Sequence, residues 1–515
     1  MSTRKPCLLG IDCGTQSLRA VIVDAGGRLL ASAAREYPIQ YPQIAWAEQD
    51  AHDWWRAACE TVPRAMAEAG VTADDIVGLS VDGTSCTVVV TTRDGKPLHP
   101  VILWMDQRAH REAQQVTDTA HPRLKYVSWA ESPEWMIPKA MWLRHNRPDI
   151  YEQADLIVEG TDWLMHKLTG QWAASLNNAT CKWNYASVDG GWPTELLDVL
   201  GFSELRDKWP DTVLAMGEHA GELTTAAAAE LGLRPGTAVA QGGIDAYAAM
   251  LGLGVVHPGR LALVMGTSTC PLALMSEGIF DSHLWGPYPD ALIPGTWVLE
   301  GGQTATGAIV TWLADNFGYR EQFDAEQQGR SRFELLDEMA AATPPGAEGL
   351  VLLDYWQGNR TPLRDPLARG AIWGLSLKHG IGHMLRAVYE GTAMGCRHIL
   401  EDMAAAGFDT EEVYACGGGT RSDLWLQIHA DICRKPILLT QEPEATALGT
   451  AVCAAAGAGL YRDLVEASEQ MVTVTRRIEP DEGNARLYDT LFDRYLRTYP
   501  ALMELMHESA TDEPH

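Results

Sequence analysis

The sequence predicts an α/β protein of two domains, and three observations lead to this prediction. The chain has 515 residues, which is too long for one hydrophobic core and suits two domains of roughly 250 residues each. Strand-like and helix-like segments alternate along the first half, and the alternation starts again in the second half. A turn-rich connector over residues 252–259 separates the halves. We therefore place the domains at 1–253 and 254–503, followed by a tail over 504–515.

The chain opens with a predicted β-hairpin, because two apolar runs, residues 7–11 and 20–23, flank the segment Asp12-Cys13-Gly14-Thr15-Gln16-Ser17-Leu18. A hairpin pairs its strands antiparallel, so the sheet is expected to be mixed rather than purely parallel. In the first half we expect strands at 7–11, 20–24, 75–81, 87–92, 156–159 and 238–241, and helices at 51–68, 137–146 and 223–231. In the second half we expect strands near 261–265, 297–300, 413–416 and 437–440, and helices near 304–315, 383–403, 421–433 and 445–456.

Two Gly-Thr turns are candidate phosphate loops. Gly14-Thr15 lies in the opening hairpin, and Gly266-Thr267 follows the apolar run at 261–265, about half the chain later. Such a turn aims backbone N–H groups and hydroxyls outward, where an anion can bind. Asp12, at the end of its strand, is badly placed for packing and well placed to hold Mg²⁺ through water beside a nucleotide. Either turn alone is also explained as an ordinary hairpin turn, whereas the repetition favours two similar halves that share one nucleotide.

Composition and charge restrict the classes of partner. The formal net charge is −28, which argues against nucleic acid, because binding it relies on neutralisation of phosphates by Lys and Arg. The ten cysteines are scattered without a Cys-x-x-Cys pair, as expected for reduced core residues of a cytosolic protein. No apolar run reaches membrane-spanning length, and the first strand is too short for the core of a signal peptide. We therefore expect a cytoplasmic protein with no membrane partner.

Asp245 is the candidate catalytic base. It follows Gly242-Gly243-Ile244 at the point where a strand gives way through glycines to a helix. A carboxylate there can accept the proton of a substrate hydroxyl while the oxygen attacks a phosphoryl group. From spacing alone, the simpler interpretation is that Asp245 caps the following helix.

Other residues are candidates for binding a nucleoside or a sugar. Gly417-Gly418-Gly419 ends a strand and opens a helix, where glycines let a flat ligand approach the backbone or simply form a tight turn. Sugar sites combine buried hydrogen-bonding groups with a flat apolar wall, which makes Trp104 and Lys182-Trp183 candidates. A tryptophan in the core and a lysine with its stem on the surface are the simpler interpretations.

Two other kinds of site are disfavoured. His379 and His383 have metal-ligand spacing for a helix, but Gly380 and Gly382 weaken that helix and no third ligand follows at a matching interval. The sequence also has no Gly-x-x-x-x-Gly-Lys-Ser/Thr segment, which excludes a Walker-type phosphate loop. A nucleotide site would therefore have to be of the split kind, built from two halves.

Taken together, these residues resemble the FGGY family of carbohydrate kinases, within the superfamily of actin, sugar kinases and the Hsp70 ATPase. The resemblance extends from about residue 7 to about residue 460. One family signature is met position by position. It reads Gly370-x-Ile372-x-Gly374-Leu375, then after seven residues His383-Met384-x-x-Ala387-Val388-Tyr389-Glu390. The resemblance implies two actin-like, ribonuclease H-like domains, and it assigns the histidine pair to a family helix rather than to a metal.

The resemblance also implies roles for individual residues. Asp245 would be the catalytic base, and Asp12 would help to place Mg²⁺ together with it. Residues implied to surround ATP are Gly14, Thr15, Gln16, Gly266 and Thr267 at the phosphates, and Gly418 and Ser422 at the adenosine. Residues implied to hold the sugar are Ser85, Lys182 and Glu300, with Trp104 as a candidate wall. The expected partners are ATP, Mg²⁺ and a small sugar, and a homodimer stays open.

Within the family, several stretches resemble D-ribulokinases. These are residues 181–183, 285–288, 294–297, 300–303 and 358–362. Thr84-Ser85-Cys86-Thr87 is closer in spelling to L-ribulokinases, which leaves the isomer open. We expect ATP-dependent phosphorylation of a ketopentose, D-ribulose first, with L-ribulose, xylulose, ribitol or a tetritol as alternatives. A nucleotide-switched binding protein of the actin and Hsp70 kind would not need Asp245, Lys182 and Glu300 together. The presence of Asp12, Thr15, Asp245 and Thr267 argues against an inactive sugar sensor.

Overall fold

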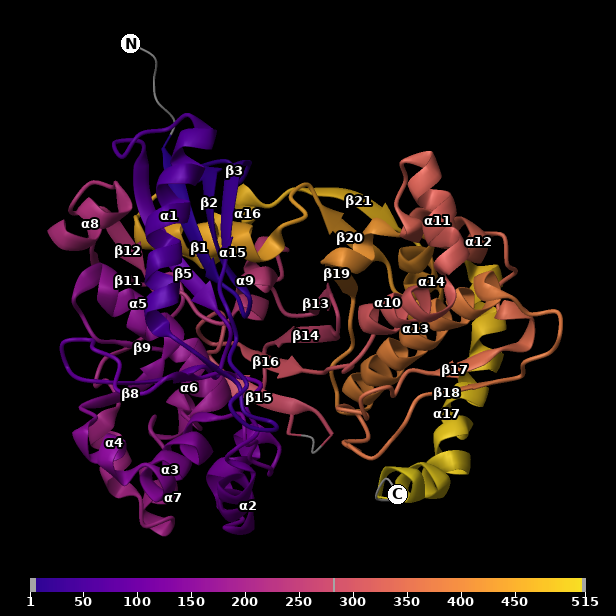
Figure 1. Ribbon diagram of the computed structural model, residues 1–515, viewed down its shortest axis with the longest axis horizontal. Helices are drawn as coiled ribbons and strands as arrows, with labels where there is room; N and C mark the ends of the chain where they lie inside the picture. Colours follow the sequence, from indigo (N-terminus) through magenta and orange to yellow (C-terminus); the bar gives the residue numbers. More distant parts are fainter. Residues whose placement is uncertain (1–5, 281–282, 512–515) are drawn as a thin grey trace. The chain divides into compact units, whose positions relative to one another are not determined.

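The computed structural model describes residues 6–280 and 283–511, which form two compact units (Figure 1). The first unit contains the chain up to Pro258, together with Leu274–Leu299 and Glu444–Thr473. The second contains Gly259–Ala273, Glu300–Pro443 and the residues from Val474 onward. Segments 274–299 and 444–473 thus pack in the first unit although they follow the predicted boundary at residues 253 and 254.

A six-stranded mixed sheet forms the centre of the first unit. Its order is β11 (His219–Glu222), β12 (Ala238–Ala240), β5 (Ile76–Gly83), β1 (Cys7–Cys13), β2 (Ser17–Asp24) and β3 (Leu29–Glu36). β1 pairs antiparallel with β2 and parallel with β5. The predicted opening hairpin and the mixed sheet are therefore confirmed.

Strand alternation decides which helix covers which face of this sheet. Leu9 and Ile11 of β1 point into the core that they share with α1 (Ala51–Ala69). Gly10 points to the other face, where a Cβ atom would lie 3.3 Å from the Ala447 carbonyl oxygen of α15 (Ala445–Gly457). Figure 1 shows the orange α15 beside the indigo β1 and the neighbouring β5. Asp12 has the same parity as Gly10 and therefore points to the α15 face.

Helix α9 (Asp245–Gly252) packs closely on α15 because both helices carry glycine at the contact. A Cβ atom on Gly449 would lie 1.7 Å from the Ala248 carbonyl oxygen, and one on Gly252 would lie 1.9 Å from that of Ala445. Any side chain at either position would therefore separate the two helices. The contact fixes the helix that begins with Asp245 against the helix that contains Thr450.

The remaining elements of the first unit surround this framework. A second sheet has the order β4 (Glu48–Gln49), β7 (Val101–Ile102), β6 (Val88–Thr91) and β8 (Leu156–Glu159). The other helices of the first unit are α2 (His110–Asp118), α3 (Met136–Asn146), α4 (Pro148–Gln153), α5 (Gly160–Thr169), α6 (Leu176–Lys182), α7 (Thr194–Val199), α8 (Thr225–Leu231) and α16 (Leu464–Met471). The short strands β9 (Ala174–Ser175) and β10 (Val213–Leu214) pair with each other, and β15 (Trp285–Pro289) precedes β16 (Trp297–Glu300).

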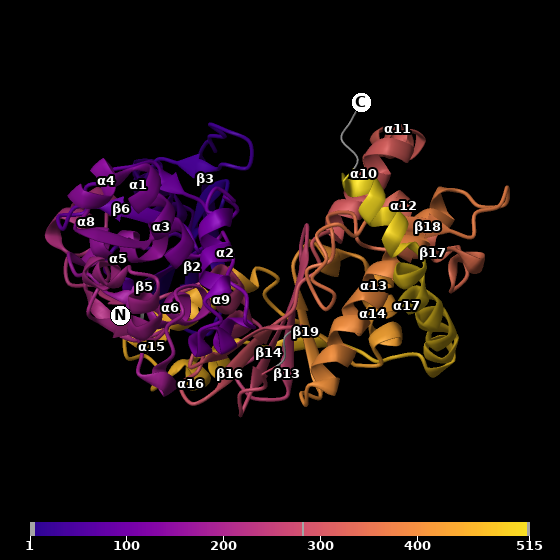
Figure 2. The same ribbon diagram turned by 90° about the horizontal axis from the view of Figure 1, so that it is seen from below.

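The second unit repeats the hairpin arrangement. β13 (Arg260–Met265) pairs antiparallel with β14 (Thr269–Met275) and parallel with β19 (Glu412–Cys416). β19 also pairs in parallel with β20 (Ile437–Thr440), which pairs antiparallel with β21 (Val474–Ile478). Its helices are α10 (Gly307–Phe317), α11 (Tyr319–Gln328), α12 (Arg332–Ala341), α13 (Ile381–Ala405), α14 (Asp423–Cys433) and α17 (Glu482–Thr511), and β17 (Val351–Leu353) pairs with β18 (Ala371–Trp373). Helix α13 packs on α14 (Figure 2). A hairpin whose first strand also pairs in parallel with a later strand thus occurs in both units, as the two Gly-Thr turns predict.

The structure also describes the end of the chain, the cysteines and the lengths of the helices. Helix α17 continues to Thr511, so residues 504–511 of the predicted tail are helical, while residues 512–515 lie outside the described part. All ten cysteines are free and eight of them are buried, as expected for reduced core residues. Within the described ranges, no helix combines the length and apolar character needed to cross a membrane.

Candidate functional site

The turn between β1 and β2 carries the first predicted phosphate loop. The Gly14 N–H donates to the Ser17 carbonyl oxygen at 3.0 Å, which closes the turn. Neighbours hold it from outside, because Tyr37 donates to the Gly14 carbonyl oxygen at 2.5 Å and Gln49 Nε2 donates to that of Thr15 at 2.7 Å. Trp104 Nε1 donates to the Thr15 hydroxyl oxygen at 3.0 Å. The structure thus places the candidate sugar wall next to the candidate phosphate loop.

Asp12 has a carboxyl neighbour that sequence reasoning missed. Asp12 and Asp82 are paired residues of the parallel strands β1 and β5, so both side chains point to the α15 face. Asp82 is fully buried and accepts a hydrogen bond from the Thr450 hydroxyl of α15, while its other oxygen, Oδ1, has no hydrogen-bond partner among the described residues. The signal that could have found it is Asp82-Gly83 at the end of an apolar strand, which matches the position of Asp12 in β1.

Burial and mutual repulsion make these carboxyls electrostatically unusual. Burial raises the pKa of Asp12 to about 6, against the opposing effects of Arg19 and of a hydrogen bond with Asp82. Burial also raises the pKa of Asp82 well above its usual range, and the charges of Asp12 and Asp245 raise it further. Three carboxyl groups therefore interact at one place in the first unit. Such a concentration of negative charge is typical of a site that binds a cation or handles protons.

Asp245 is the first residue of α9 rather than its cap. The N-cap position is Ile244, and Asp245 Oδ1 accepts the adjacent Ala246 N–H at 2.6 Å. Gly242, three residues before it, leaves no room for a side chain, since a Cβ atom there would lie 1.8 Å from the Val81 carbonyl oxygen. Asp245 is half-buried. The capping interpretation is therefore wrong, and its role as a base stays a prediction.

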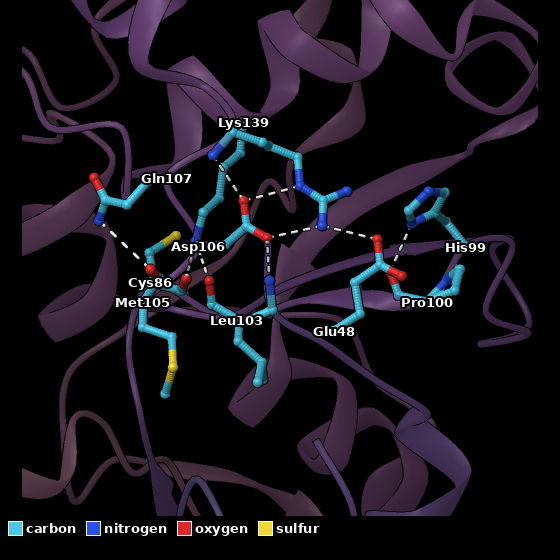
Figure 3. Close-up of polar contacts among 11 residues, drawn as sticks. Glu48, Cys86, His99, Pro100, Leu103, Met105, Asp106, Gln107 and Lys139 are labelled. Carbon is cyan, nitrogen blue, oxygen red and sulfur yellow. Dashed lines mark hydrogen bonds and ion pairs between the residues drawn. The ribbon is translucent and has the colours of Figure 1, made fainter. Parts of the chain in front are cut away.

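Ser85 lies in a turn, residues 84–87, that buried side chains hold in place. The Ser85 hydroxyl donates to Glu159 Oε1 at 3.2 Å, and the Thr87 N–H donates to Glu159 Oε2 at 2.9 Å. From the other side, Lys139 Nζ donates to the carbonyl oxygens of Cys86 at 2.7 Å and Leu103 at 2.8 Å (Figure 3). Lys139 thereby joins the turn that carries Ser85 to Leu103, the residue that precedes Trp104.

The turn that contains Trp104 is stabilised by a buried ion pair. Asp106 accepts from Arg108 Nε at 2.8 Å and from Arg108 Nη2 at 2.7 Å, and it also accepts the Ala47 N–H at 2.6 Å. Figure 3 shows this network beside Lys139, with Glu48 on the far side of the guanidinium. Both charges are fully desolvated and multiply hydrogen-bonded, the condition under which a buried pair fixes a conformation. Neither Lys139 nor Asp106 was singled out from sequence.

Lys182 is the last residue of α6 and lies beside aromatic rings. Its Nζ is 5.6 Å from the centroid of the buried Trp135 ring, which in turn contacts Trp285 edge-to-face at 5.3 Å. The next residue, Trp183, is fully buried and donates from Nε1 to Glu159 Oε1 at 2.8 Å. Lys182 therefore lies among aromatic side chains, whereas its contact with a sugar stays a prediction.

The second Gly-Thr turn, Gly266-Thr267, lies exposed between β13 and β14 in the second unit. The start of α10 packs on it, since the Gly307 N–H donates to the Gly266 carbonyl oxygen at 3.2 Å and the Ala308 N–H donates to that of Thr267 at 3.0 Å. A Cβ atom on Gly307 would lie 2.4 Å from that Gly266 oxygen. The positive end of a helix dipole therefore lies against the second candidate phosphate loop.

A cavity of about 900 Å³ adjoins this turn within the second unit. It is lined by Gly266, Thr267, Gly418 and Ser422, which had been predicted to contact ATP, and also by Asp337, Tyr389 and Trp425, which had not. Gly418 has open space where a Cβ atom would be. Trp425 stacks on Tyr389 with ring centroids 5.0 Å apart, so the wall offers a flat aromatic surface. The volume is typical of a site for a ligand of nucleotide size.

Ser422 also has a structural role in this cavity. Its hydroxyl oxygen accepts the Trp425 N–H at 3.0 Å as the N-cap of α14, and the hydroxyl donates to Asp337 Oδ1 at 2.5 Å.

Glu300 is the last residue of β16 and is half-buried. The adjacent Gly301 N–H donates to the Pro271 carbonyl oxygen at 2.9 Å, which fixes the backbone there. The ligand roles of Ser422 and Glu300 stay predictions.

The histidine pair lies at the start of α13. His383 is in the first turn of α13, where its Nδ1 accepts the Gly380 N–H at 3.2 Å and its Nε2 lies 3.2 Å from Glu348. Over residues 6–280 and 283–511, no group of three or more His, Cys, Asp or Glu side chains is arranged to hold a metal ion. The expectation that the pair belongs to a helix holds for His383, whereas His379 lies just before that helix.

Comparison with known proteins adds to this geometry. Residues 7–252 match the N-terminal domain model of the FGGY family of carbohydrate kinases, and residues 261–458 match its C-terminal domain model. The chain is 34% identical to the ribulokinase of Anoxybacillus flavithermus, over 96% of this chain and 94% of that protein. It is 33% identical to the human FGGY carbohydrate kinase domain-containing protein, over 95% of each. A crystal structure of xylulose kinase from Rhodospirillum rubrum aligns with a TM-score of 0.84 and 28% identity, over 97% of this chain and 100% of that one.

Proposed function

Since this chain belongs to the FGGY family of carbohydrate kinases, we propose that it transfers the γ-phosphoryl group of ATP to the terminal hydroxyl of D-ribulose. The observation that carries the proposal is Asp245, which is the first residue of α9 rather than its N-cap and whose charge acts on the buried Asp82 carboxyl, the neighbour of Asp12. Similarity to proteins named ribulokinase supports the substrate class, and the stretches at residues 181–183 and 285–288 support the D isomer.

In this proposal the first unit contributes the base and sugar contacts. Asp245 accepts the proton of the terminal hydroxyl as that oxygen attacks phosphorus, so the oxygen does not develop a positive charge. Ser85, Trp104 and Lys182 line the sugar site, with Lys182 donating to an oxygen of the sugar. Glu300, of the second unit, keeps the sugar-binding role that the family resemblance implies.

The second unit contributes nucleotide contacts. We assign the adenosine to the cavity lined by Gly418, Ser422, Tyr389 and Trp425, where the stacked rings offer a flat wall for the base. We assign the Thr267 hydroxyl to a phosphate, beside the positive end of the α10 dipole, whose first N–H groups donate to the turn itself. Gly14, Thr15 and Gln16 have the same role in the first unit.

The described residues form no cluster of three metal ligands, so we propose that carboxyl groups of the first unit hold a magnesium ion together with water and phosphate oxygens. Mg²⁺ prefers oxygen ligands and usually takes one or two carboxylates together with waters and substrate phosphates. Asp12 would supply one such oxygen, with Asp245 as the predicted second, and the unpartnered buried Oδ1 of Asp82 is a further acceptor for a cation. When bound, the ion would neutralise phosphate charge. This chain's own residues orient the hydroxyl and remove its proton.

The proposal is tested by measuring ADP release with D- and L-ribulose, D- and L-xylulose, ribitol and tetritols. We expect D-ribulose to exceed L-ribulose by at least about tenfold in kcat/KM, since one unpaired buried polar group costs about 1–3 kcal/mol. Similar rates for all ketopentoses, or preference for a tetritol, would refute the substrate assignment but leave a carbohydrate kinase. L-Ribulose is the second candidate because residues 84–87 resemble L-ribulokinases.

A further inference from the structure

Glu159 is a fully buried carboxylate that sequence analysis did not single out. It is the last residue of β8, and three hydrogen-bond donors converge on it. Oε1 accepts from the Ser85 hydroxyl at 3.2 Å and from Trp183 Nε1 at 2.8 Å, while Oε2 accepts from the Thr87 N–H at 2.9 Å. One carboxylate therefore connects the turn of Ser85 to the residue that follows Lys182.

The chemistry of these groups fixes the direction of each hydrogen bond. An indole N–H and a backbone N–H can only donate, and an ionised carboxylate can only accept. A serine hydroxyl has one proton and two lone pairs. Because its proton is directed to Glu159, Ser85 can only accept a hydrogen bond from any other group. Ser85 is half-buried, so its oxygen is not fully enclosed by protein.

We propose that Glu159 is a positioning residue that makes Ser85 a hydrogen-bond acceptor toward the sugar, so that this position of the pocket selects a hydroxyl group and rejects a carbonyl group. The inference rests on the proposed function, because it takes Ser85 as part of the sugar site. It adds that the ketone oxygen of the substrate is bound by a donor elsewhere in the pocket. Lys182, which has only donors, suits that oxygen.

Burial and the neighbouring donors have opposite effects on Glu159. Burial raises the pKa of Glu159 above its usual value, against the opposing effects of hydrogen bonds from Trp183, Cys86 and the Thr87 N–H and of the charge of Lys139. Because these donors are directed at the carboxyl group, its oxygens act as acceptors toward Ser85 and Trp183. Lys139 also holds the Cys86 carbonyl oxygen at 2.7 Å, so the turn of Ser85 is fixed on both sides of the serine.

The first test is the variant Glu159→Gln, which replaces one acceptor oxygen with an NH₂ donor of the same shape. The amide cannot accept from all three donors, so Ser85 loses its fixed direction. We expect kcat/KM for the preferred sugar to fall about 5- to 150-fold, the range for one unpaired buried polar group, while KM for ATP changes less than about twofold. In this background, Ser85→Ala should add less than about threefold, because both changes remove the same interaction.

A matched control separates this effect from general damage to a buried carboxylate. Asp431 is 2% exposed and also accepts three hydrogen bonds, from Gln427 Nε2 at 2.8 Å, the Asp481 N–H at 2.7 Å and Asn484 Nδ2 at 3.0 Å. Asp431→Asn should lower thermal stability without changing the ratio of kcat/KM values between sugars. Wild-type sugar kinetics in Glu159→Gln, or effects of Glu159→Gln and Ser85→Ala that simply multiply, would overturn the proposal.

A second test needs only the wild type and Ser85→Ala, in case Glu159→Gln does not fold. Deoxy and deoxyfluoro analogues of the preferred sugar are compared at each hydroxyl that is not phosphorylated. Fluorine can accept a hydrogen bond but cannot donate one. At the position facing Ser85, we expect the wild type to phosphorylate both analogues more slowly than the parent sugar, and by the same factor. Ser85→Ala should phosphorylate both analogues at nearly its rate with the parent sugar.

The outcomes of this second test separate the two proposals. A fluoro analogue that keeps activity where the deoxy analogue loses it, with the difference abolished in Ser85→Ala, would show that Ser85 donates and would overturn the role of Glu159. Absence of turnover of every ketopentose by the wild type would instead refute the proposed substrate. The same analogue series is then made from the polyol that is phosphorylated, and equal losses at one position would still support Glu159.

Discussion

Replacing Glu131 with glutamine should change how the stability of the protein depends on pH. Glu131 is 7% exposed and accepts a hydrogen bond from Asn184 Nδ2 at 2.9 Å, while its Oε1 has no hydrogen-bond partner among the described residues. Burial raises the pKa of this carboxyl from its ordinary 4.5 to about 8, against the opposing effect of the Asn184 hydrogen bond. The folded protein therefore binds a proton that the unfolded chain has released across this range.

The sign and size of the effect follow from linkage. Between pH 4.5 and about 8 the native state holds one proton more than the unfolded state at this site, so the free energy of unfolding falls as pH rises. The slope is about 1.4 kcal/mol per pH unit, or roughly 5 kcal/mol over the whole range. Glu131→Gln removes this contribution and leaves an amide that can still accept from Asn184. The free energy of unfolding of the variant, relative to that of the wild type, should therefore rise with pH throughout this range and stay constant above it.

The assay compares thermal unfolding of the two proteins at pH 5, 6.5 and 8. The difference in Tm should change by about 1–2 °C per pH unit in favour of the variant, given the unfolding entropy of a chain or unit of this size. Glu152→Gln is the control, because Glu152 is exposed, and its Tm should stay at a constant offset from the wild type. Parallel Tm curves for wild type and Glu131→Gln would refute the reasoning, since they would mean that Glu131 titrates alike in both states.

Three further predictions concern the proposed site. Asp245→Asn should reduce turnover about 10²- to 10⁴-fold in the ADP-release assay while ATP affinity by calorimetry stays near that of the wild type; wild-type turnover would exclude Asp245 as the base. Thr267→Val should weaken ATP binding and leave sugar affinity without nucleotide unchanged, so a large loss of sugar binding would show that the turn serves another ligand. Lys182→Met keeps the apolar stem, so it should abolish most sugar-dependent turnover without lowering Tm, and near-normal kinetics would remove Lys182 from the sugar site.

Local sequence patterns were sufficient to predict most secondary structure. The strands predicted at 156–159 and 437–440 have those bounds in the structure, as does the strand predicted at 297–300. Each is a short apolar run bounded by turn residues or by a polar segment, so its limits are encoded within a few residues. Both Gly-Thr turns are hairpin turns, for the same reason.

The arrangement of the candidate site depended on contacts between distant segments. Asp82 stands beside Asp12 because β5 pairs in parallel with β1, and Thr450 reaches Asp82 from α15, 368 positions further along the chain. Glu159 likewise accepts hydrogen bonds from Ser85 and Trp183, which folding brings to it from other parts of the chain. Nothing near Glu159 in the sequence distinguishes a carboxyl that binds a partner from one that faces water.

The sequence by itself determined the hairpins, the alternation of strands and helices, the family and the glycines at which backbone must approach backbone. These features depend on hydrophobic periodicity and on residues whose conformational range is set by their own covalent structure. Only the tertiary structure decided that Asp245 begins its helix without capping it, and that segment 444–473 packs in the first unit. Only it showed that Glu159 fixes the hydroxyl of Ser85. Such decisions require the donors, acceptors and packing surfaces of distant segments to meet in space, which no local pattern records.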